Sequence, residues 1–387
     1  MAVVGLERNV RYNRADLELA IRKVLEPLGG IARFVHEGDR VLIKPNIVAP
    51  GPPHSGVCTH PLFVRAVCDI VAGQNPARIR VGDLPGYNYQ GEIRRCLHES
   101  GLAEALAGGP ARIVPFEGAF DRVPGERFRT YRYIDLTREV AEADVVINLP
   151  KLKTHRLTSY TGAIKNAFGC VSYGTRERIH KIGDYREFCD GLVDIYEWVR
   201  PALTIADVVR VREGNGPCAG SPLDVGVILA SADGVAVDSV GQYLLGFEPG
   251  EVLTTDLAHE RGLGEIDLDI VRVAGPEDWR AARVAARRPN RLYSWVYFRL
   301  PKPVFKPIAA MARVKPVFAS KKCDLCGLCL ENCPGQALSV QKKSVRRDRK
   351  SCRLCFGCVL LCPRGAAVPR WDAVSVGSKL MSEKYLR

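Results

Sequence analysis

Eight cysteines near the C-terminal end of the chain repeat one spacing twice. Residues 323–334 and residues 352–363 both read Cys-x2-Cys-x2-Cys-x3-Cys-Pro. Three thiolates at this spacing can surround one face of an iron–sulfur cube, and in two-cluster ferredoxins the fourth cysteine ligates the other cluster. The pattern therefore predicts two [4Fe–4S] clusters. The predicted ligands are Cys323, Cys326, Cys329 and Cys362 for one cluster, and Cys352, Cys355, Cys358 and Cys333 for the other.

Zinc and disulfide bonds are the alternatives for such a cysteine-rich segment. A structural zinc site typically uses paired Cys-x2-Cys arms or histidines at metal spacing, rather than two four-cysteine runs that each end in proline. Thiolates in this arrangement suit iron–sulfur clusters better. A chain that holds such clusters is expected to transfer electrons.

Polar residues follow several short apolar runs in the first 250 residues. Lys44-Pro45-Asn46 follows residues 41–43, Asp83 follows residues 79–81, and a basic segment follows residues 144–149. If these runs are neighbouring strands, the polar residues meet at the edge of the sheet where ligands bind in α/β folds. The predicted catalytic residues are His155, His180, Lys165, Lys153, Lys151 and Lys44, and the predicted substrate-binding residues are Asn46, His54, His60, Asp83, Thr161, Asn166 and Asn215.

These side chains indicate an anionic ligand. Lysines hold carboxylate, phosphate, phenolate or enolate groups as mobile point charges, and a histidine can supply a proton near neutral pH. The alternative interpretations are that the lysines are solvated surface charges and that His60 caps a helix or packs in the core. A metal site formed by His54, Cys58 and His60 is a less favoured interpretation, because no second ligand pair lies nearby in the sequence.

The spacing of apolar residues predicts an α/β fold, with a mostly parallel sheet and helices on both of its faces. Strands are expected at 3–6, 40–43, 79–81, 144–149, 203–209 and 225–230, and helices at 14–28, 61–71, 91–106 and 235–245. We expect an α/β substrate or catalytic domain at 1–282, a connector at 283–320, a bacterial-type ferredoxin domain with two [4Fe–4S] clusters at 321–370, and a tail at 371–387.

The bulk properties of the 387 residues are those of a globular protein, with 47% hydrophobic and 26% charged residues. No run of about 18 apolar residues occurs, and the first residues contain acids and arginines where an export signal would be apolar. Cluster thiolates also require a reducing compartment. We therefore expect a cytoplasmic location.

The net charge of +13 is concentrated near the clusters. Residues 280–322 contain twelve Arg or Lys and no acid, and residues 342–353 contain seven more with Asp348 as the one acid. Clusters with four thiolates are anionic, so cations are expected around them. The basic segments contain no nucleic-acid-binding motif, and nucleic acid is therefore not an expected partner.

The connector combines this positive charge with prolines and aromatic rings. We expect it to pack across both domains. An interfacial membrane anchor is the less favoured alternative, since basic and aromatic segments can lie among lipid headgroups; a protein-docking surface is a third. The residues concerned are Pro289, Pro301, Pro303, Pro307 and Pro316, and Tyr293, Trp295, Tyr297, Phe298, Phe305 and Phe318.

Three segments resemble the domain-of-unknown-function 362 family, whose members are often fused to a two-cluster ferredoxin segment. They are Lys44-Pro45-Asn46, ADVVINLPKLKTHRLTSYTGAIKNAFGCV at 143–171 and EGNGPCAGSPLDVGVILASADGVAVDSVG at 213–241. The similarity covers about residues 36–250 and the ferredoxin segment. It implies an α/β domain distantly similar in fold to lactate-racemase-like proteins, and an iron–sulfur oxidoreductase role.

The leading functional prediction is a reductase. An external low-potential donor of the ferredoxin or flavodoxin type would supply electrons, and a small anionic, conjugated or aromatic substrate would accept them at the Lys/His residues. The chain has no G-x-G-x-x-G, Walker A or G-x-S-x-G motif that would suggest nucleotide or hydrolase chemistry. The alternatives are an electron carrier or maturation partner that docks a protein, and a binding protein for an organic cofactor.

Overall fold

In the computed structural model the chain divides into two units, Met1–Pro289 and Asn290–Arg387. The structure describes residues 1–86, 89–116, 120–125, 128–290, 297–299, 314–333, 335–341 and 343–371. The first unit contains the predicted Lys/His residues, and the second contains both cysteine runs. The boundary between the units lies within the predicted connector.

In the described part of the first unit, ten strands form one sheet. Parallel pairing joins β4, β3, β2, β7 and β10 in that order, whereas β11 is antiparallel to both β10 and β1. The eight strands of the main path are β12 (Arg272–Ala274), β1 (Val3–Glu7), β11 (Ser221–Ser231), β10 (Leu203–Glu213), β7 (Val145–Leu149), β2 (Arg40–Pro45), β3 (Arg78–Val81) and β4 (Arg112–Ile113). Strand β8 (Lys151–His155) pairs with β10 and with β9 (Ser159–Thr161).

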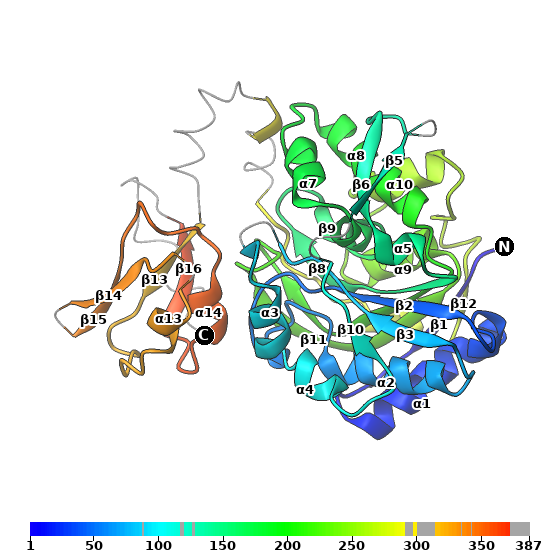
Figure 1. The fold of residues 1–387 in the computed structure, drawn as a ribbon, viewed down its shortest axis with the longest axis horizontal. Helices are drawn as coiled ribbons and strands as arrows, with labels where there is room; N and C mark the ends of the chain where they lie inside the picture. Colours follow the sequence, from blue (N-terminus) through cyan, green and yellow to red (C-terminus); the bar gives the residue numbers. More distant parts are fainter. Residues whose placement is uncertain are drawn as a thin grey trace. The chain divides into compact units, whose positions relative to one another are not determined.

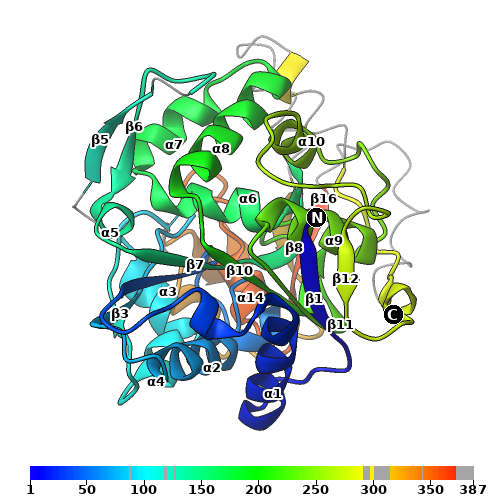
Figure 2. The same ribbon diagram turned by 90° about the vertical axis from the view of Figure 1, so that its right-hand side faces the viewer.

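Helices cover both faces of this sheet, as predicted (Figures 1 and 2). One face is covered by α1 (Arg14–Leu25), α2 (Pro61–Ala72) and α4 (Leu102–Leu106), and the other by α6 (Ala163–Asn166), α8 (Tyr185–Val199) and α9 (Gly234–Leu244). The remaining elements of this unit include α3 (Ile93–Glu99), α5 (Arg138–Ala141), α7 (Tyr173–His180), α10 (Leu253–Glu260), and the hairpin of β5 (Phe120–Pro124) and β6 (Tyr133–Thr137).

Several boundaries differ from the sequence prediction for local reasons. The predicted helix 14–28 is α-helical only to Leu25 and ends in a 3-10 turn, since Pro27 cannot donate the next backbone hydrogen bond. The predicted helix 91–106 is two helices, separated at Gly101, whose φ of 72° is left-handed. Strands β10 and β11 are longer than predicted and are joined by a short turn, which permits only antiparallel pairing.

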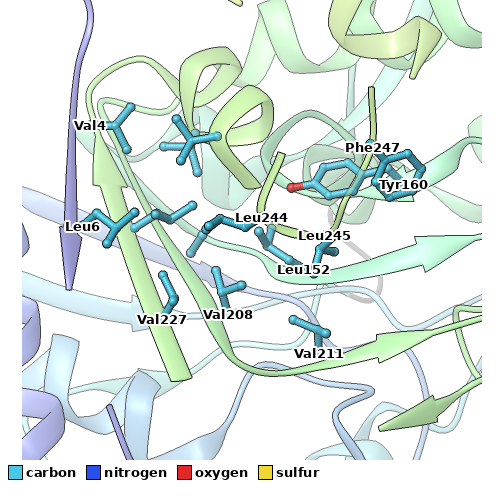
Figure 3. Packing of buried hydrophobic residues seen from close by; sticks show 14 of the residues in the cluster. Val4, Leu6, Leu152, Tyr160, Val208, Val211, Val227, Leu244, Leu245 and Phe247 are labelled. Atoms are coloured by element: carbon cyan, nitrogen blue, oxygen red, sulfur yellow. The ribbon is translucent and has the colours of Figure 1, made fainter. Parts of the chain in front are cut away.

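A cluster of buried aliphatic and aromatic side chains fixes the sheet to its covering layer (Figure 3). Val4 and Leu6 of β1, Val208 of β10 and Val227 of β11 lie side by side across the sheet. Leu244, Leu245 and Phe247 at the end of α9 pack against them together with Leu152 and Tyr160. Each such side chain contributes about 1.5–3 kcal/mol when fully buried. This packing holds β8 and β9 in place beside β10.

The second unit contains two short antiparallel pairs and two short helices. β13 (Val314–Phe318) pairs with β16 (Ala367–Trp371), and β14 (Leu338–Gln341) pairs with β15 (Ser344–Arg347). Helices α13 (Leu328–Glu331) and α14 (Gly357–Leu361) each begin after the second cysteine of a run and contain the third, Cys329 and Cys358. Both cysteine runs have the same backbone: left-handed φ values occur at Leu325, Gly327 and Gln336 and at the corresponding Leu354, Phe356 and Gly365.

Most of the predicted connector lies outside the described residues. This applies to Tyr293, Trp295, Phe305, Pro301, Pro303 and Pro307, and also to residues 372–387 of the predicted tail. Within the described segments, no helix has the length and apolar content needed to cross a membrane.

Candidate functional site

Strand β8 carries three of the predicted residues on one face. Strand β7 ends at Leu149, and after Pro150 the chain continues directly as β8, which pairs with the later part of β10. Side chains alternate along a strand, so Lys151, Lys153 and His155 share one face. The sequence analysis placed these residues after a strand; the structure places them on a further strand.

Two of the predicted lysines are in buried ion pairs. Lys44 Nζ lies 2.8 Å from Asp83 Oδ1, and Lys151 Nζ lies 2.8 Å from Asp207 Oδ2. Asp83 also accepts hydrogen bonds from the backbone N–H groups of Ile47 and Leu84. The lysines are therefore not solvated surface charges. Asp83, predicted to bind substrate, thus has Lys44 and two backbone N–H groups as partners in the structure.

Lys151 belongs to a network that fixes His60. Tyr12 donates from its hydroxyl to Asp207 Oδ1 over 2.7 Å, and Lys151 Nζ lies 2.5 Å from the same hydroxyl. The Tyr12 ring is stacked on the His60 imidazole, with ring centroids 3.7 Å apart. His60 Nδ1 accepts from the N–H of Leu62, so His60 is the N-cap of α2. Burial lowers the pKa of His60 to about 4, and the imidazole is neutral at pH 7.

A second network links Asn46, Lys153 and Asn166. Lys153 Nζ donates to Asn46 Oδ1 over 2.6 Å and to the carbonyl of Val57 over 2.5 Å. Asn46 donates in turn to Asn166 Oδ1 over 2.8 Å, and Lys44 donates to the same oxygen over 3.3 Å. Lys153 is completely buried, and burial lowers its pKa to about 8. These partners of Lys153 are neutral oxygens, and no carboxylate pairs with it among the residues that the structure describes.

Arg212 stands beside Lys153 and was not predicted from the sequence. The two residues are register partners between β10 and β8. Arg212 donates to the carbonyl of Ser55 over 2.6 Å, its Nε is buried without a hydrogen-bond partner in the described chain, and it is only 4% exposed. Burial lowers its pKa to about 10. Arg212 and Lys153 together hold the loop Ser55–Val57 by its carbonyl groups.

Lys165 is the most distinctive of the predicted residues. It lies on α6, where its ammonium nitrogen is 3.9 Å from the centroid of the Phe168 ring. Among the described residues, no hydrogen-bond partner is found for this nitrogen. Burial, followed by the charges of Arg176, Lys153 and Lys44, lowers the pKa of Lys165 to about 7. Lys165 therefore releases its proton much closer to neutral pH than an exposed lysine does.

The two histidines near Lys165 have opposite hydrogen-bonding roles. His155 Nδ1 accepts from the N–H groups of Leu157 and Thr158, so the proton of a neutral His155 is on Nε2. His180 Nδ1 donates to the carbonyl of Arg176 over 2.8 Å, so its Nε2 is an acceptor. Burial and the charge of Lys165 lower the pKa of His155 well below 6.5 and that of His180 to about 4.

Arg176 completes this group and was also missed by the sequence analysis. It is 4% exposed and donates to the carbonyls of Phe168, Pro85 and Leu84. We use the name cation cluster for a group of five basic residues: Lys153, Lys165, Arg176, His155 and His180. Within this group, the positive charges of neighbouring members lower the pKa values of Lys165, His155 and His180. Its members are held by carbonyls, an amide and aromatic rings. Such a cluster favours an anionic ligand, because a bound anion would compensate its charge.

The remaining residues that were predicted to bind substrate lie outside the cation cluster. Thr161 is the register partner of Lys153 on β9, and its buried hydroxyl has no hydrogen-bond partner in the described residues. Asn215 lies in the turn between β10 and β11. His54 is exposed, and its carbonyl accepts from Arg210. Among the described residues, no three His, Cys, Asp or Glu side chains could hold a single metal ion, so the structure gives no site formed by His54, Cys58 and His60.

The cysteines of the second unit line two separate small cavities. Cys333, Cys352, Cys355 and Cys358 line one, and Cys323, Cys326, Cys329 and Cys362 line the other. Each set therefore combines three cysteines of one run with the fourth cysteine of the other run. The N–H of Ala337 donates to Cys333 Sγ over 3.2 Å, and that of Ala366 donates to Cys362 Sγ over 3.2 Å. Four thiols around each cavity, with an N–H directed at one sulfur, fit a [4Fe–4S] cluster.

Comparison with known families agrees with both units. The model of the "Domain of unknown function (DUF362)" matches residues 41–242, and that of the 4Fe-4S dicluster domain matches residues 322–366. The chain belongs to the DUF362 family. The resemblance predicted from the sequence, and the fusion of this DUF362 domain to a ferredoxin-type domain, are therefore confirmed.

A curated relative of this DUF362 protein is the "Thylakoid-associated protein" of Synechocystis sp. (strain ATCC 27184 / PCC 6803 / Kazusa). It is 36% identical over 264 residues, which cover 67% of this chain and 79% of the relative. The lactate racemase apoprotein of Thermoanaerobacterium thermosaccharolyticum has a TM-score of 0.41 and 9% identity, with 63% of this chain and 57% of that chain covered. A protein of Thermotoga maritima has a TM-score of 0.34 and 12% identity, with 62% and 61% covered. This chain thus spans less than two thirds of either solved structure.

Proposed function

We propose that this protein is an iron–sulfur reductase whose substrate is a small, conjugated anion bound at the cation cluster. The observation that carries the proposal is the burial of Lys153 and Arg176, whose hydrogen bonds within the described residues go to neutral oxygens. Burying cations without counter-charges costs several kcal/mol each. An anionic ligand would offset that cost, and a carboxylate, phenolate or enolate would do so.

The chain would hold the clusters through the two cysteine sets, Cys323, Cys326, Cys329 and Cys362, and Cys333, Cys352, Cys355 and Cys358. When bound, two [4Fe–4S] clusters supply electrons one at a time at low potential, which suits unsaturated carbonyl compounds and aromatic rings. An external donor of the ferredoxin or flavodoxin type would replace those electrons.

In this proposal Lys165 is the proton donor. A general acid works best when its pKa is near the working pH, and the pKa of Lys165 is lowered to about 7 by burial. His155 would donate a hydrogen bond from Nε2 to the bound anion, while Lys153 would hold the anion by charge. The Phe168 ring beneath Lys165 offers an apolar surface for a flat, conjugated skeleton.

Lys44 and Lys151 have a positioning role in this scheme. Their ion pairs with Asp83 and Asp207 fix β2, β8 and β10 relative to one another, which places Asn46 and Lys153. We therefore do not assign proton transfer to Lys44 or Lys151.

A substrate screen tests the proposal. Anaerobically purified protein is reduced with dithionite, freed of excess reductant, and mixed with conjugated carboxylic acids and phenols. The amide or methyl ether of each compound is the matched neutral control. We expect reoxidation by at least one anion and a much slower reaction with its neutral counterpart. Equal reactivity of the charged and neutral forms, or no reaction at all, would overturn the proposal.

A second candidate function is a dedicated electron carrier that docks a protein through the first unit. The observation that favours it is an open groove lined by Phe34, Phe128 and Trp198 together with Arg33 and Arg200. Trp198 is 40% exposed, and exposed aromatic and arginine side chains are common in protein interfaces. If wild type but not a Trp198→Ala variant retained a stoichiometric partner, and neither protein showed substrate-dependent reoxidation, this second candidate would be favoured over the reductase.

The name of the Synechocystis relative raises membrane contact as a further question for this chain. The basic connector at 283–320 is the segment that would contact an anionic lipid surface. Co-sedimentation with phosphatidylserine vesicles, and release by salt, would support peripheral contact. Equal binding to neutral vesicles would contradict an electrostatic contact.

A further inference from the structure

The two cysteine runs of the second unit share one backbone but differ in charge next to the thiols. Their left-handed residues correspond one to one, and both fourth cysteines accept an N–H hydrogen bond of 3.2 Å. Hydrogen bonds to sulfur and local charge are two of the factors that set cluster potentials. Since these two hydrogen bonds are matched, charge is the clearest difference between the two sites.

The charge differs at the residue that directly follows the first cysteine of each run. This residue is Asp324 in the first run and Arg353 in the second, and each lines the cavity of its own run. Asp324 Oδ1 accepts from the N–H of Cys326 over 3.2 Å, which keeps the carboxylate beside a ligand cysteine.

The two runs also differ at the residue that follows their final Cys-Pro. Asp324 is in an ion pair with Arg364, whose Nε lies 2.9 Å from Asp324 Oδ2. The residue that corresponds to Arg364 in the other half of the repeat is Gly335, and the Arg353 side chain passes it: a Cβ on Gly335 would lie 3.6 Å from Arg353 Cγ. At these two corresponding positions, one run therefore has an aspartate and an arginine, whereas the other has an arginine and a glycine.

The other charged residues near the two runs also make the second run more positive than the first. Residues 320–333 contain Lys321, Lys322, Asp324 and Glu331, so their formal charges cancel. Residues 349–362 contain Arg349, Lys350 and Arg353 and no acid. The segment that surrounds the second cavity is thus the more positive one.

We infer that the two clusters have different reduction potentials, and that the cluster of Cys333, Cys352, Cys355 and Cys358 has the higher one because of Arg353. Reduction by one electron adds one negative charge to a cluster, and a cation nearby stabilises that charge. An electron that a low-potential donor gives to the other cluster would then move to this one. The inference rests on the two-cluster part of the proposed function and is independent of the substrate.

Redox titration of the holoprotein, followed by electron paramagnetic resonance, tests the inference without any substrate. Dithionite supplies the electrons, and the first readout is whether the wild-type protein has two separate midpoint potentials. Arg353→Gln should lower only the upper midpoint, whereas Asp324→Asn, which leaves Arg364 without its counter-charge, should raise only the lower one. Both changes bring the midpoints together.

Two further variants make the result specific. Arg353→Lys keeps the charge and should leave the upper midpoint close to its wild-type value, and Arg370→Gln removes an exposed arginine from β16 that lines neither cavity and should change neither midpoint. The inference is overturned by one shared midpoint in the wild-type protein. It is also overturned if Arg353→Gln shifts the lower midpoint or neither of them.

Discussion

Single residues in the first unit show two kinds of buried cation. Lys44 and Lys151 are each neutralised by an aspartate at 2.8 Å, whereas Lys153, Arg176 and Arg212 are held by neutral oxygens. The first arrangement is stable by itself and suits a structural role. The second leaves positive charge inside the protein, which suits binding of an anion.

Removing the counter-charge of Lys151 should cost much of the stability of the first unit. Asp207→Asn leaves the Lys151 ammonium buried without a carboxylate, and breaking such a pair costs about 3–5 kcal/mol. The matched control is Glu177→Gln, which breaks the exposed pair with Lys181 at 2.7 Å and should cost less than about 1 kcal/mol. Anaerobic urea unfolding measures both. Equal losses would show that the buried pair has no special role.

Lys165 should give the protein a characteristic dependence on pH. Its pKa is about 7 in the folded protein and near its usual value of 10.5 when unfolded, so between these values the unfolded state binds more protons. The stability contributed at this residue therefore rises with pH in that window. Lys165→Met removes the effect: the variant should be more stable than wild type at pH 6, and its advantage should shrink above pH 7. Thermal unfolding across this range measures the difference, and a constant difference would contradict the assignment.

From the sequence, the residues that gather at this site could be recognised, but many of the residues that they contact could not. Lys44, Lys153, Lys165, Asn46 and Asn166 were recognised because polar residues after apolar runs mark the end of a sheet, and the structure brings all five together. The partners from distant segments were missed. They are Tyr12, Arg176, Asp207 and Arg212, of which Asp207 was visible as an acid inside the apolar run 203–209.

At the scale of elements, the site depends on the continuation of β7 into β8. The alternation of KLKTH at 151–155 places basic side chains on one face and Leu152 and Thr154 on the other. This period of two was the available signal for a strand, but Pro150 suggested that the strand had ended. Pairing with β10 is what continues the strand, and that pairing joins segments far apart in the sequence.

A substitution in the turn after α6 should also destabilise the first unit, because this turn passes close to the Lys44–Asp83 pair. A Cβ at Gly169 would lie 2.0 Å from Asp83 Oδ1 and 2.6 Å from Lys44 Nζ. Gly169→Ala should therefore break this pair and cost about 3–5 kcal/mol.

The control for that substitution is Gly174→Ala on α7, where the nearest atom would be Ser172 Oγ at 3.7 Å. Alanine favours a helix over glycine by about 1 kcal/mol, so this variant should be as stable as wild type or more stable. Chemical unfolding of both variants gives the comparison. If Gly169→Ala were as stable as Gly174→Ala, the pair would not be fixed by this turn.

At the scale of the whole molecule, the chain combines a DUF362 domain with a 4Fe-4S dicluster domain. The cysteine spacing identified the second domain from sequence alone, because cluster ligation requires that spacing. The substrate could not be predicted in the same way, since a fold does not determine the molecule that binds to it.

The metal content should follow from the two cysteine sets. Anaerobically purified protein should contain about eight irons per chain, as two four-iron clusters require. Cys326→Ser should lower this content, because Cys326 lines one of the two cavities. Cys189→Ala, which changes a buried thiol of the first unit, should leave it unchanged. Iron and sulfide analysis measures this, and about four irons in the wild-type protein would contradict two clusters.

The most direct test of the central claim is the rate at which the reduced protein is reoxidised by the best anion from the substrate screen. It is measured by stopped-flow absorbance for wild type, Lys165→Met and the surface control Lys181→Met. The account predicts that Lys181→Met reacts like wild type and that Lys165→Met is slower by about 10²–10⁴-fold, the usual contribution of a general acid. Reoxidation of Lys165→Met at the wild-type rate would contradict it.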